Sequence, residues 1–416
     1  MRVNIDYISR VEGEGSVKLE ISEGKLKNLK LNIWEPPRFF EGFLCKRSYA
    51  EVPDIVARIC GICPVSHMTT SIRALEKALG FTPSTEITNI RHIMALSQIV
   101  ASHLVHLYMF ALPDYHKLTS ITDMFPGFQP ELKRLNRMKE VINNLTALFG
   151  GRPLHPVVMV VGGFTNLPSR DMVRKMIKDL EDLKDDAMKT LRMISSLPFP
   201  DLTSTAEYVV IRNPSDYAIN EGFMVSNNRI NDIEDDYSII FVEKEVPYSN
   251  AKKTIIKDRG PLMVGALARV NLNFDMLHED AKKTAREVGF SPPDYNPFHN
   301  ILAQAIEIVH GISRCIELLD CLTLKKDEIE IKVREGEGLA VTEAPRGLLF
   351  HSYKLNRRGT VEKANIVTPT AHNFWSLEEN LKKLVEQHID EKKEEIVLKC
   401  EMLVRAYDPC FSCSVH

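Results

Sequence analysis

Two pairs of cysteines near opposite ends of this 416-residue chain are the residues best suited to do chemistry. The first pair is Cys60 and Cys63, and the second is Cys410 and Cys413. Two distant Cys-x-x-Cys pairs can close on one metal ion, and four sulfur ligands are typical of structural zinc. A redox-active dithiol or an iron–sulfur site is the alternative. The cysteines alone therefore predict a soft metal between both ends of the chain, and they do not select nickel.

The residues around the first pair favour a thiolate. Cys63 directly precedes Pro64, a residue suited to the first position of a helix, so Cys63 is expected near the N-cap. Unpaired N–H groups and the helix dipole favour an anion there. His67 follows one turn later. It either donates a hydrogen bond to a metal-bound sulfur or lies on the surface of the helix, and the spacing does not decide between these readings.

The composition excludes several classes of protein. A formal net charge of −3 gives no reason to expect a nucleic acid or an anionic membrane as a partner. Eight cysteines in a chain of this length do not indicate a disulfide scaffold, and the first residues contain no apolar core of a signal peptide. The predicted location is therefore a reducing cytoplasm, where Cys-x-x-Cys is more often metal-binding or redox-active than a disulfide.

One apolar stretch imitates a membrane span. Residues 92–113 are mostly apolar, but they include polar side chains that a lipid-facing helix would bury at high cost. A buried central helix is therefore expected, and no membrane span.

The rest of the chain is predicted to be a helix-rich α+β protein that brings the cysteine pairs together. Alternating residues in 1–45 predict short antiparallel strands, and 200–270 predicts an irregular section with some β-structure. Ser376 and Glu379 have the spacing of a capping box at the start of the final helix. The predicted helices span 64–79, 86–111, 130–149, 169–195, 297–322 and 376–405.

A set of motifs along the whole chain resembles the large subunit of nickel–iron hydrogenases, in particular its cytosolic sulfhydrogenase and NAD(P)-linked branch. Each motif is weak by itself, whereas all of them in this order are specific. The motifs are Arg10-Val11-Glu12-Gly13, Arg38-Phe39-Phe40-Glu41, Arg58-Ile59-Cys60-Gly61-Ile62-Cys63 with His67, Gly150-Gly151-Arg152-x-x-His155-Pro156, Glu343-Ala344-Pro345-Arg346-Gly347, Pro369-Thr370-x-x-Asn373 and Asp408-Pro409-Cys410-x-x-Cys413-x-x-His416.

The resemblance implies one interlocked domain over residues 1–416, with a central buried helix bundle and small peripheral antiparallel sheets. Its expected parts are the N-terminal strands 1–45, a helical core of 52–200 and 295–405, the β-containing section 200–270, and a metal-binding arm at 406–416. The implied activity is reversible cleavage of dihydrogen into two protons and two electrons. The implied partners are an iron–sulfur small subunit and further flavin- or NAD(P)-linked electron-transfer subunits.

The resemblance also assigns the four cysteines. Cys60 and Cys410 are the expected terminal nickel ligands, and Cys63 and Cys413 are expected to bridge nickel to an iron that carries carbon monoxide and cyanide. Other implied roles concern the surroundings of the metals. Arg346 is expected to place its guanidinium over the metals, and the backbone at Pro345 and the Thr370 hydroxyl are expected to bind the cyanides. Glu12 is the expected proton acceptor for Cys410. A magnesium or ferrous ion near the C-terminus is expected to be bound by Glu41, the Ile366 carbonyl and His416.

One position departs from the family pattern. Many relatives place an aspartate beside the active-site arginine where this chain has Ser102. Arg346 is therefore expected to rely on Asp408 and on backbone groups. The remaining cysteines (Cys45, Cys315, Cys321 and Cys400) are expected to be packed core thiols.

Two alternatives remain at this point: a non-catalytic relative of the kind found in respiratory complex I, and a zinc-stapled scaffold protein. The complex I relative lacks the metal cysteines, which this chain has. The chain ends at His416, the position where maturation proteases of the family cut. We therefore expect a longer precursor whose tail is removed after metal insertion.

Overall fold

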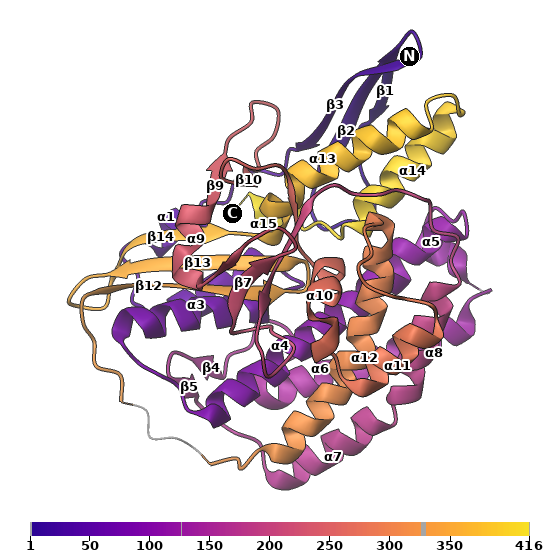
Figure 1. Cartoon of the computed structure of the whole chain (residues 1–416). Coiled ribbons are helices and arrows are strands. Elements are labelled where there is room, and N and C mark those ends of the chain that lie inside the picture. Colours follow the sequence, from indigo (N-terminus) through magenta and orange to yellow (C-terminus); the bar gives the residue numbers. More distant parts are fainter. Residues whose placement is uncertain (1, 126, 326–329, 416) are drawn as a thin grey trace.

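The molecule is built from long helices and several small sheets (Figure 1). The computed structural model describes residues 2–125, 127–325 and 330–415. The α-helices are α1 (Phe40–Leu44), α2 (Val52–Val56), α3 (Pro64–Leu79), α4 (Thr85–Val105), α5 (Leu112–Tyr115), α6 (Gln129–Gly150), α7 (Arg170–Glu181), α8 (Lys184–Ser195), α9 (Tyr237–Ile240), α10 (Ala266–Asn273), α11 (Glu279–Glu287), α12 (Asn300–Cys321), α13 (Pro369–Gln387), α14 (Lys393–Ala406) and α15 (Phe411–Ser414).

Short helical turns connect several of these helices. They are η1 (Ala57–Ile59), η2 (His106–Ala111, a π-helix), η3 (Ile121–Met124), η4 (Glu234–Asp236), η5 (Phe274–Met276) and η6 (Pro297–His299).

The strands form sheets of two to four members. The strands are β1 (Arg2–Ile5), β2 (Gly15–Ser22), β3 (Lys25–Ile33), β4 (Met159–Val160), β5 (Gly163–Phe164), β6 (Glu207–Arg212), β7 (Phe223–Ser226), β8 (Asn231–Asp232), β9 (Phe241–Lys244), β10 (Lys253–Ile256), β11 (Leu262–Met263), β12 (Gly336–Ala344), β13 (Gly347–Leu355) and β14 (Val361–Val367). The sheet orders are β1-β2-β3, β4-β5, β11-β6-β7-β8, β10-β9 and β12-β13-β14. All neighbours are antiparallel except β11 and β6, which run parallel.

The apolar stretch in the first third of the chain is a core helix. Helices α4, η2 and α5 follow one another from Thr85 to Tyr115, and in length and composition this helix is the one membrane-span candidate among the described residues. Within its most apolar window, 83% is buried inside the protein, mostly against α6 and α12. This is the expected behaviour of a central helix.

Local sequence signals place the first cysteine pair as expected. Helix α3 begins at Pro64 with Cys63 as its N-cap residue, and it ends at Leu79 with Gly80 as its C-cap residue, which adopts φ 66°. Glycine is favoured at such a left-handed position because it has no Cβ. Strand β2 alternates as predicted, with Val17, Leu19 and Ile21 buried.

Three predictions about elements are wrong in part. The helix expected at 169–195 is broken between α7 and α8, and that expected at 376–405 is replaced by α13 and α14. Helix α13 starts earlier because Pro369 occupies its first turn, so Ser376 lies inside the helix and bonds the Asn373 carbonyl at 3.0 Å instead of forming a capping box. The segment 295–405 is not wholly helical, since β12–β14 lie within it.

The sheet β12–β14 is not peripheral. Both β12 and β13 pack on α3, whose N-terminus carries Cys63. The final helix α15 contacts α13, and Figure 1 shows it inside the outline of the molecule beside this sheet. The two segments that carry the cysteine pairs are thus brought together by α3, the β12–β14 sheet and α13.

Candidate metal centre

The first cysteine loop binds its own sulfur with backbone groups. The N–H groups of Ile62 and Cys63 point at Cys60 Sγ, at 3.2 and 3.4 Å. A hydrogen bond from the Cys63 thiol, helped by Arg346 and the Ile62 N–H, lowers the pKa of Cys60 despite its burial. The same hydrogen bond and burial raise the pKa of Cys63. The loop therefore stabilises negative charge on the Cys60 sulfur, whereas Cys63, which the sequence predicts to be the favoured thiolate, has a raised pKa and holds its proton more strongly.

The second cysteine loop is held by segments distant in sequence. The N–H of Phe411 donates to the Glu12 carbonyl at 2.8 Å, and the N–H of Cys410 donates to the Thr370 hydroxyl at 2.8 Å. Gly13 has φ 85°, and a Cβ there would lie 2.6 Å from the nitrogen of Ser412. Only glycine leaves room for this close approach of two backbones.

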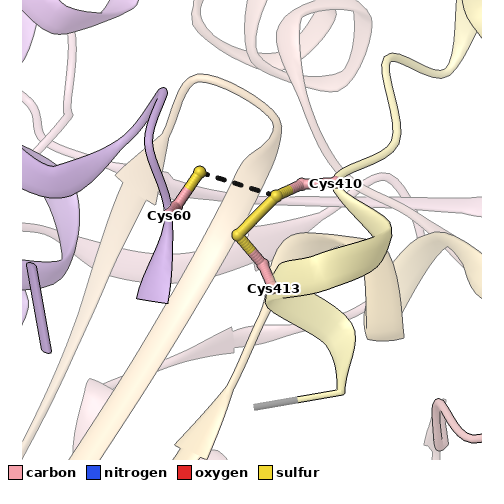
Figure 2. A group of neighbouring side chains, drawn as sticks. All are labelled: Cys60, Cys410 and Cys413. Carbon is pink, nitrogen blue, oxygen red and sulfur yellow. Dashed lines mark hydrogen bonds between the residues drawn. A yellow bond between two sulfur atoms is a disulfide. The ribbon is translucent and has the colours of Figure 1, made fainter. Parts of the chain in front are cut away.

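The two loops meet sulfur to sulfur. Cys60 Sγ lies 3.6 Å from Cys410 Sγ, and Figure 2 shows these side chains pointing at each other from different parts of the chain. Potential ligand atoms of Cys60, Cys410 and Cys413 lie within 4.8 Å of one another, and so do those of Cys63, His67 and Cys413. All four cysteines are at most 5% exposed. The structure therefore brings the predicted sulfur ligands into one buried cluster.

Cys410 and Cys413 are joined by a disulfide in the structure, whereas the sequence predicts two thiolates (Figure 2). Cysteines that ligate the same ion lie close enough to bond to each other when oxidised. Since the thiolate is the metal-binding form of cysteine, both sulfurs of this pair would be thiolates in the metal-bound protein.

Arg346 lies beside the cysteine cluster and is paired with Asp408. Its Nη2 is 2.9 Å from Asp408 Oδ1, and its Nε donates to the Asp408 carbonyl at 2.7 Å. Burial alone would lower the pKa of Arg346, but Asp408 and the thiols of Cys60 and Cys63 raise it. The guanidinium is therefore a permanent positive charge next to the sulfurs.

Ser102, which stands where many relatives have an aspartate, does not provide the contact to Arg346 that the aspartate would make. The Ser102 hydroxyl is buried and has no hydrogen-bond partner within the described part of the chain. Asp408 instead accepts a hydrogen bond from Gln304 Nε2 at 3.1 Å in addition to the bonds from Arg346. The expectation that Arg346 relies on Asp408 and on a backbone group thus agrees with the geometry.

His67 is buried, so the surface reading of this residue is wrong. A ring nitrogen of His67 lies within 4.8 Å of the sulfurs of Cys63 and Cys413. Its Nδ1 is 3.1 Å from His351 Nε2, and His351 Nδ1 is 2.6 Å from the Tyr353 hydroxyl. With the Tyr353 hydroxyl as donor to His351 Nδ1, a neutral His351 carries its proton on Nε2 and donates it to His67 Nδ1.

Glu12 contacts the second loop through both carboxylate oxygens. Cys410 Sγ lies 2.8 Å from Oε2, and the Ser412 hydroxyl donates to Oε1. A carboxylate at hydrogen-bond distance from a sulfur can accept its proton. The residue is half-buried, so it links the buried cluster to the outer part of the protein.

The structure describes two of the three predicted ligand residues of the second metal site. Glu41 Oε1 accepts a hydrogen bond from the N–H of Ile366 at 2.7 Å, so these two residues are neighbours. His416 lies outside the described residues.

Beside the cysteines lies a small cavity, with about 10 Å³ open to a water-sized group. It is lined by Cys63, His67, Ala344, Pro345, Arg346, Leu349, Pro369, Cys410 and Cys413. Arg346 Nη1 is buried without a hydrogen-bond partner among the described residues. Soft sulfur ligands, a fixed positive charge and an unpaired donor fit a thiolate-bound metal that carries anionic or polar ligands.

Arg38 hydrogen-bonds both cysteine loops, a role that the sequence motifs did not predict. Its Nη2 donates to the carbonyls of Ile59 at 2.7 Å and Ser412 at 2.5 Å. No local signal predicts such a bridge, because its acceptors are backbone atoms brought together only by the fold.

The remaining cysteines divide into two kinds. Cys315 and Cys400 are buried, and burial raises the pKa of each thiol to about 12. Cys45 and Cys321 are exposed, so the prediction that they are core thiols is wrong. Both lie at the C-terminal end of a helix, α1 or α12, where the chain turns toward the surface.

Comparisons with known proteins agree with this geometry. The chain matches the family model of the nickel-dependent hydrogenases over residues 38–133 and 298–416. It is 36% identical to the sulfhydrogenase 1 subunit alpha of Pyrococcus furiosus, over 100% of this chain and 97% of that protein. It is 33% identical to the sulfhydrogenase 2 subunit alpha of the same organism, over 100% and 99%.

Solved structures show the same fold. An NAD+-reducing nickel–iron hydrogenase in its H2-reduced state matches with a TM-score of 0.89 at 23% identity, over 100% of this chain and 99% of that chain. The nickel–iron–selenium hydrogenase of Dm. baculatum matches with a TM-score of 0.80 at 21% identity, over 100% of both chains. The predicted fold class is confirmed by these similarities.

Proposed function

The chain belongs to the nickel-dependent hydrogenase family, and from this premise we propose how its residues serve the reaction. It is the catalytic large subunit of a nickel–iron hydrogenase, an enzyme that interconverts dihydrogen with two protons and two electrons. The bound nickel–iron centre supplies the Lewis acid that polarises dihydrogen and takes up its electrons. The complex I relative and the zinc scaffold are not favoured.

In this proposal, Cys60 and Cys410 would hold nickel, and Cys63 and Cys413 would be shared between nickel and iron. The distances within the cysteine cluster support this assignment, since each loop contributes one residue to each role. The iron would carry carbon monoxide and cyanide. The backbone at Pro345 and the Thr370 hydroxyl would bind the cyanides, and both residues lie close to Cys410.

The guanidinium of Arg346 acts above the metals. It offsets the negative charge of four thiolates, which a buried site cannot leave uncompensated. Asp408 fixes its orientation through two hydrogen bonds, to the side chain and to the carbonyl. The unpaired Nη1 is the atom available to polarise dihydrogen as it is split.

Glu12 removes the proton produced at Cys410. The 2.8 Å contact between Cys410 Sγ and Glu12 Oε2 is the single observation that carries this step. The Ser412 hydroxyl holds the other carboxylate oxygen, so Glu12 is aimed at the sulfur before the proton arrives. The proton then leaves through Glu12 toward the surface, because this residue is half-buried.

A second ion ties the C-terminal arm to the core. Its ligands in this proposal are Glu41, the Ile366 carbonyl and His416, which suit magnesium or ferrous iron. The neighbouring positions of Glu41 and Ile366 support the assignment.

Electrons leave to another subunit. Within the described residues, the clusters of side chains with metal-binding spacing all lie at this one centre. Four large apolar side chains are 45–68% exposed: Phe39, Phe43, Leu154 and Val157. Exposed apolar side chains are common at protein interfaces, and we assign these four to contacts with an iron–sulfur small subunit. Flavin- or NAD(P)-linked subunits then complete a cytoplasmic enzyme.

The experiment that tests this function is Glu12→Gln in the assembled enzyme, with Glu14→Gln as the matched control. Glu14 lies in the same loop and bonds Trp34 and Glu35 through its backbone. Glu12→Gln should keep nickel and iron but lose dihydrogen oxidation by about 100-fold or more, whereas Glu14→Gln should retain it. Normal turnover in Glu12→Gln would mean that protons leave by another route.

A further inference from the structure

Arg269 lies fully buried on α10, beneath the turn that presents Arg346. Its Nη1 donates to the Ala344 carbonyl at 2.9 Å, and its Nη2 donates to the Pro345 carbonyl at 2.8 Å. These two carbonyls belong to the residues directly before Arg346. A single side chain therefore holds both peptide groups that lead into the active-site arginine.

Two carboxylates fix Arg269 in turn. Glu307 accepts hydrogen bonds from Nε at 2.6 Å and from Nη2 at 2.8 Å, and Glu343 accepts one from Nη1 at 3.0 Å. All five N–H donors of the guanidinium are thus used. Only the planar, forked donor set of arginine can serve two carboxylates and two carbonyls together.

Other groups prevent Glu307 from moving. The Tyr217 hydroxyl donates to it at 2.6 Å, and His103 Nε2 lies 2.7 Å from its second oxygen. Burial opposes its ionisation, but Arg269 lowers the pKa of Glu307, so that one negative charge balances the guanidinium. Burial raises the pKa of Glu343 to about 7.

The backbone at Arg346 and Gly347 packs closely against the start of α10. A Cβ on Gly265, at the start of α10, would lie 3.0 Å from the Arg346 carbonyl, and one on Gly347 would lie 2.7 Å from the Gly265 nitrogen. The start of α10 therefore contacts the turn between β12 and β13 directly, at the Arg346 carbonyl and at Gly347.

We propose that Arg269 is a positioning residue for the reaction: it clamps the Ala344–Pro345 backbone so that the Arg346 guanidinium is held over the cysteine cluster. This inference rests on the role proposed for Arg346. Arg269 touches neither substrate nor metal ligands, and its effect on turnover passes through the placement of Arg346. A displacement of about 1 Å at a reacting group can cost about 100-fold in rate, so the clamp matters to the chemical step.

The test compares Arg269→Lys with Arg91→Lys in the assembled enzyme. Arg91 is an equally buried arginine that binds both oxygens of Glu76, at 2.8 and 2.6 Å, far in sequence from the Arg346 turn. A lysine at either position keeps the positive charge but loses the planar set of N–H donors of the guanidinium. Arg269→Lys should lower kcat by about 30-fold or more with KM for dihydrogen within about threefold, and with nickel and iron retained.

A second readout needs no bound metal. In the metal-free chain, hydrogen exchange of peptides covering residues 344–349 should become about tenfold faster in Arg269→Lys, and it should stay unchanged in Arg91→Lys. Equal losses of activity in both lysine variants would overturn the proposal, because they would mark a general effect of breaking a buried ion pair.

The double variant Arg269→Lys/Arg346→Lys separates the inference from its premise. If Arg269 acts through Arg346, the double variant should be no slower than Arg346→Lys alone, within about threefold. Multiplied losses would overturn the clamp. Full activity in Arg346→Lys would instead remove the premise, whereas an inactive Arg346→Lys beside a normal Arg269→Lys would overturn the inference alone.

A milder variant covers the case in which Arg269→Lys does not fold. Glu307→Gln keeps the shape of the side chain but offers Arg269 one oxygen in place of two. It should show a smaller loss of kcat, of about tenfold, and a smaller acceleration of hydrogen exchange at residues 344–349. Normal kcat with unchanged exchange at residues 344–349 in a folded Glu307→Gln enzyme would overturn the proposal.

Discussion

The two cysteine loops present similar sulfur ligands but are held in different ways. The first loop leads directly into α3, a helix of 16 residues, and its N–H groups bond its own Cys60 sulfur. The second loop leads into α15, which has only four residues. Its backbone is bound by Glu12, Thr370 and Arg38, which all lie far away in the sequence.

This difference shows which half of the centre depends on the rest of the fold. A helix of four residues is not stable by itself, so the position of Cys410 and Cys413 is set by tertiary contacts. The first loop has its geometry from local structure. We therefore expect changes at distant residues to disturb the second loop far more than the first.

The largest effect is expected from Gly13→Ala. The new Cβ would lie 2.6 Å from the Ser412 nitrogen and 2.9 Å from Phe411 Cβ, so the second loop must move. Nickel content should fall to a small fraction, and activity should fall by about 100-fold or more, because the ligands no longer meet within tenths of an ångström. Metal analysis and dihydrogen-dependent dye reduction measure both quantities.

Gly24→Ala is the matched control for this substitution. Gly24 has φ 67°, a backbone cost similar to that at Gly13, but no atom lies within 4 Å of its added Cβ. It should keep its nickel. Equal metal loss in both alanine variants would show that backbone strain, and not the clash with the second loop, is responsible.

A smaller effect is expected from Arg38→Lys, which removes the bridge between the loops. A lysine cannot donate to the carbonyls of both Ile59 and Ser412 in the fixed geometry of a guanidinium. Loss of nickel to a chelator should become about tenfold faster, since at least one charged hydrogen bond is lost. Arg47→Lys, at an exposed position in the same segment, should show the original rate. An unchanged rate in Arg38→Lys would refute the bridge.

The smallest effect is expected from Thr370→Val, which keeps the shape of the side chain. It leaves the buried N–H of Cys410 without its acceptor, at a cost of about 1–3 kcal/mol in the free energy of unfolding. Thr370→Ser retains the hydroxyl and should restore most of this stability. Denaturant unfolding of the metal-free chain measures the difference, and equal stability of the two variants would contradict the assigned contact.

The sequence predicted what is encoded locally. Pro64 and Gly80 marked both ends of α3, and the alternation of β2 marked its buried face. The resemblance to the hydrogenase family pointed to four cysteines, Glu12 and Arg346, and the fold brings these residues close together, while their roles stay predictions. The local predictions are confirmed because each rests on neighbouring residues in the chain.

The sequence did not predict what depends on distant backbone atoms. The acceptors of Arg38 and Arg269 are carbonyls far away in the chain, and a carbonyl carries no sequence signal. The capping box at Ser376 failed for a related reason: its spacing was correct, but Pro369 starts α13 two turns earlier. The exposure of Cys45 and Cys321 likewise follows from where their helices end.

The central claim, that both loops enclose one nickel–iron centre, is tested most directly by metal analysis combined with infrared spectroscopy of the purified enzyme. The account predicts nickel and iron in comparable amounts, together with the absorption of carbon monoxide and cyanide in a spectral region where protein is silent. Cys410→Ser should abolish both signals while leaving most of the helical content unchanged, because Cys410 lies outside the long helices, directly before the four-residue α15. Zinc in place of nickel, together with a silent infrared window, would contradict the claim.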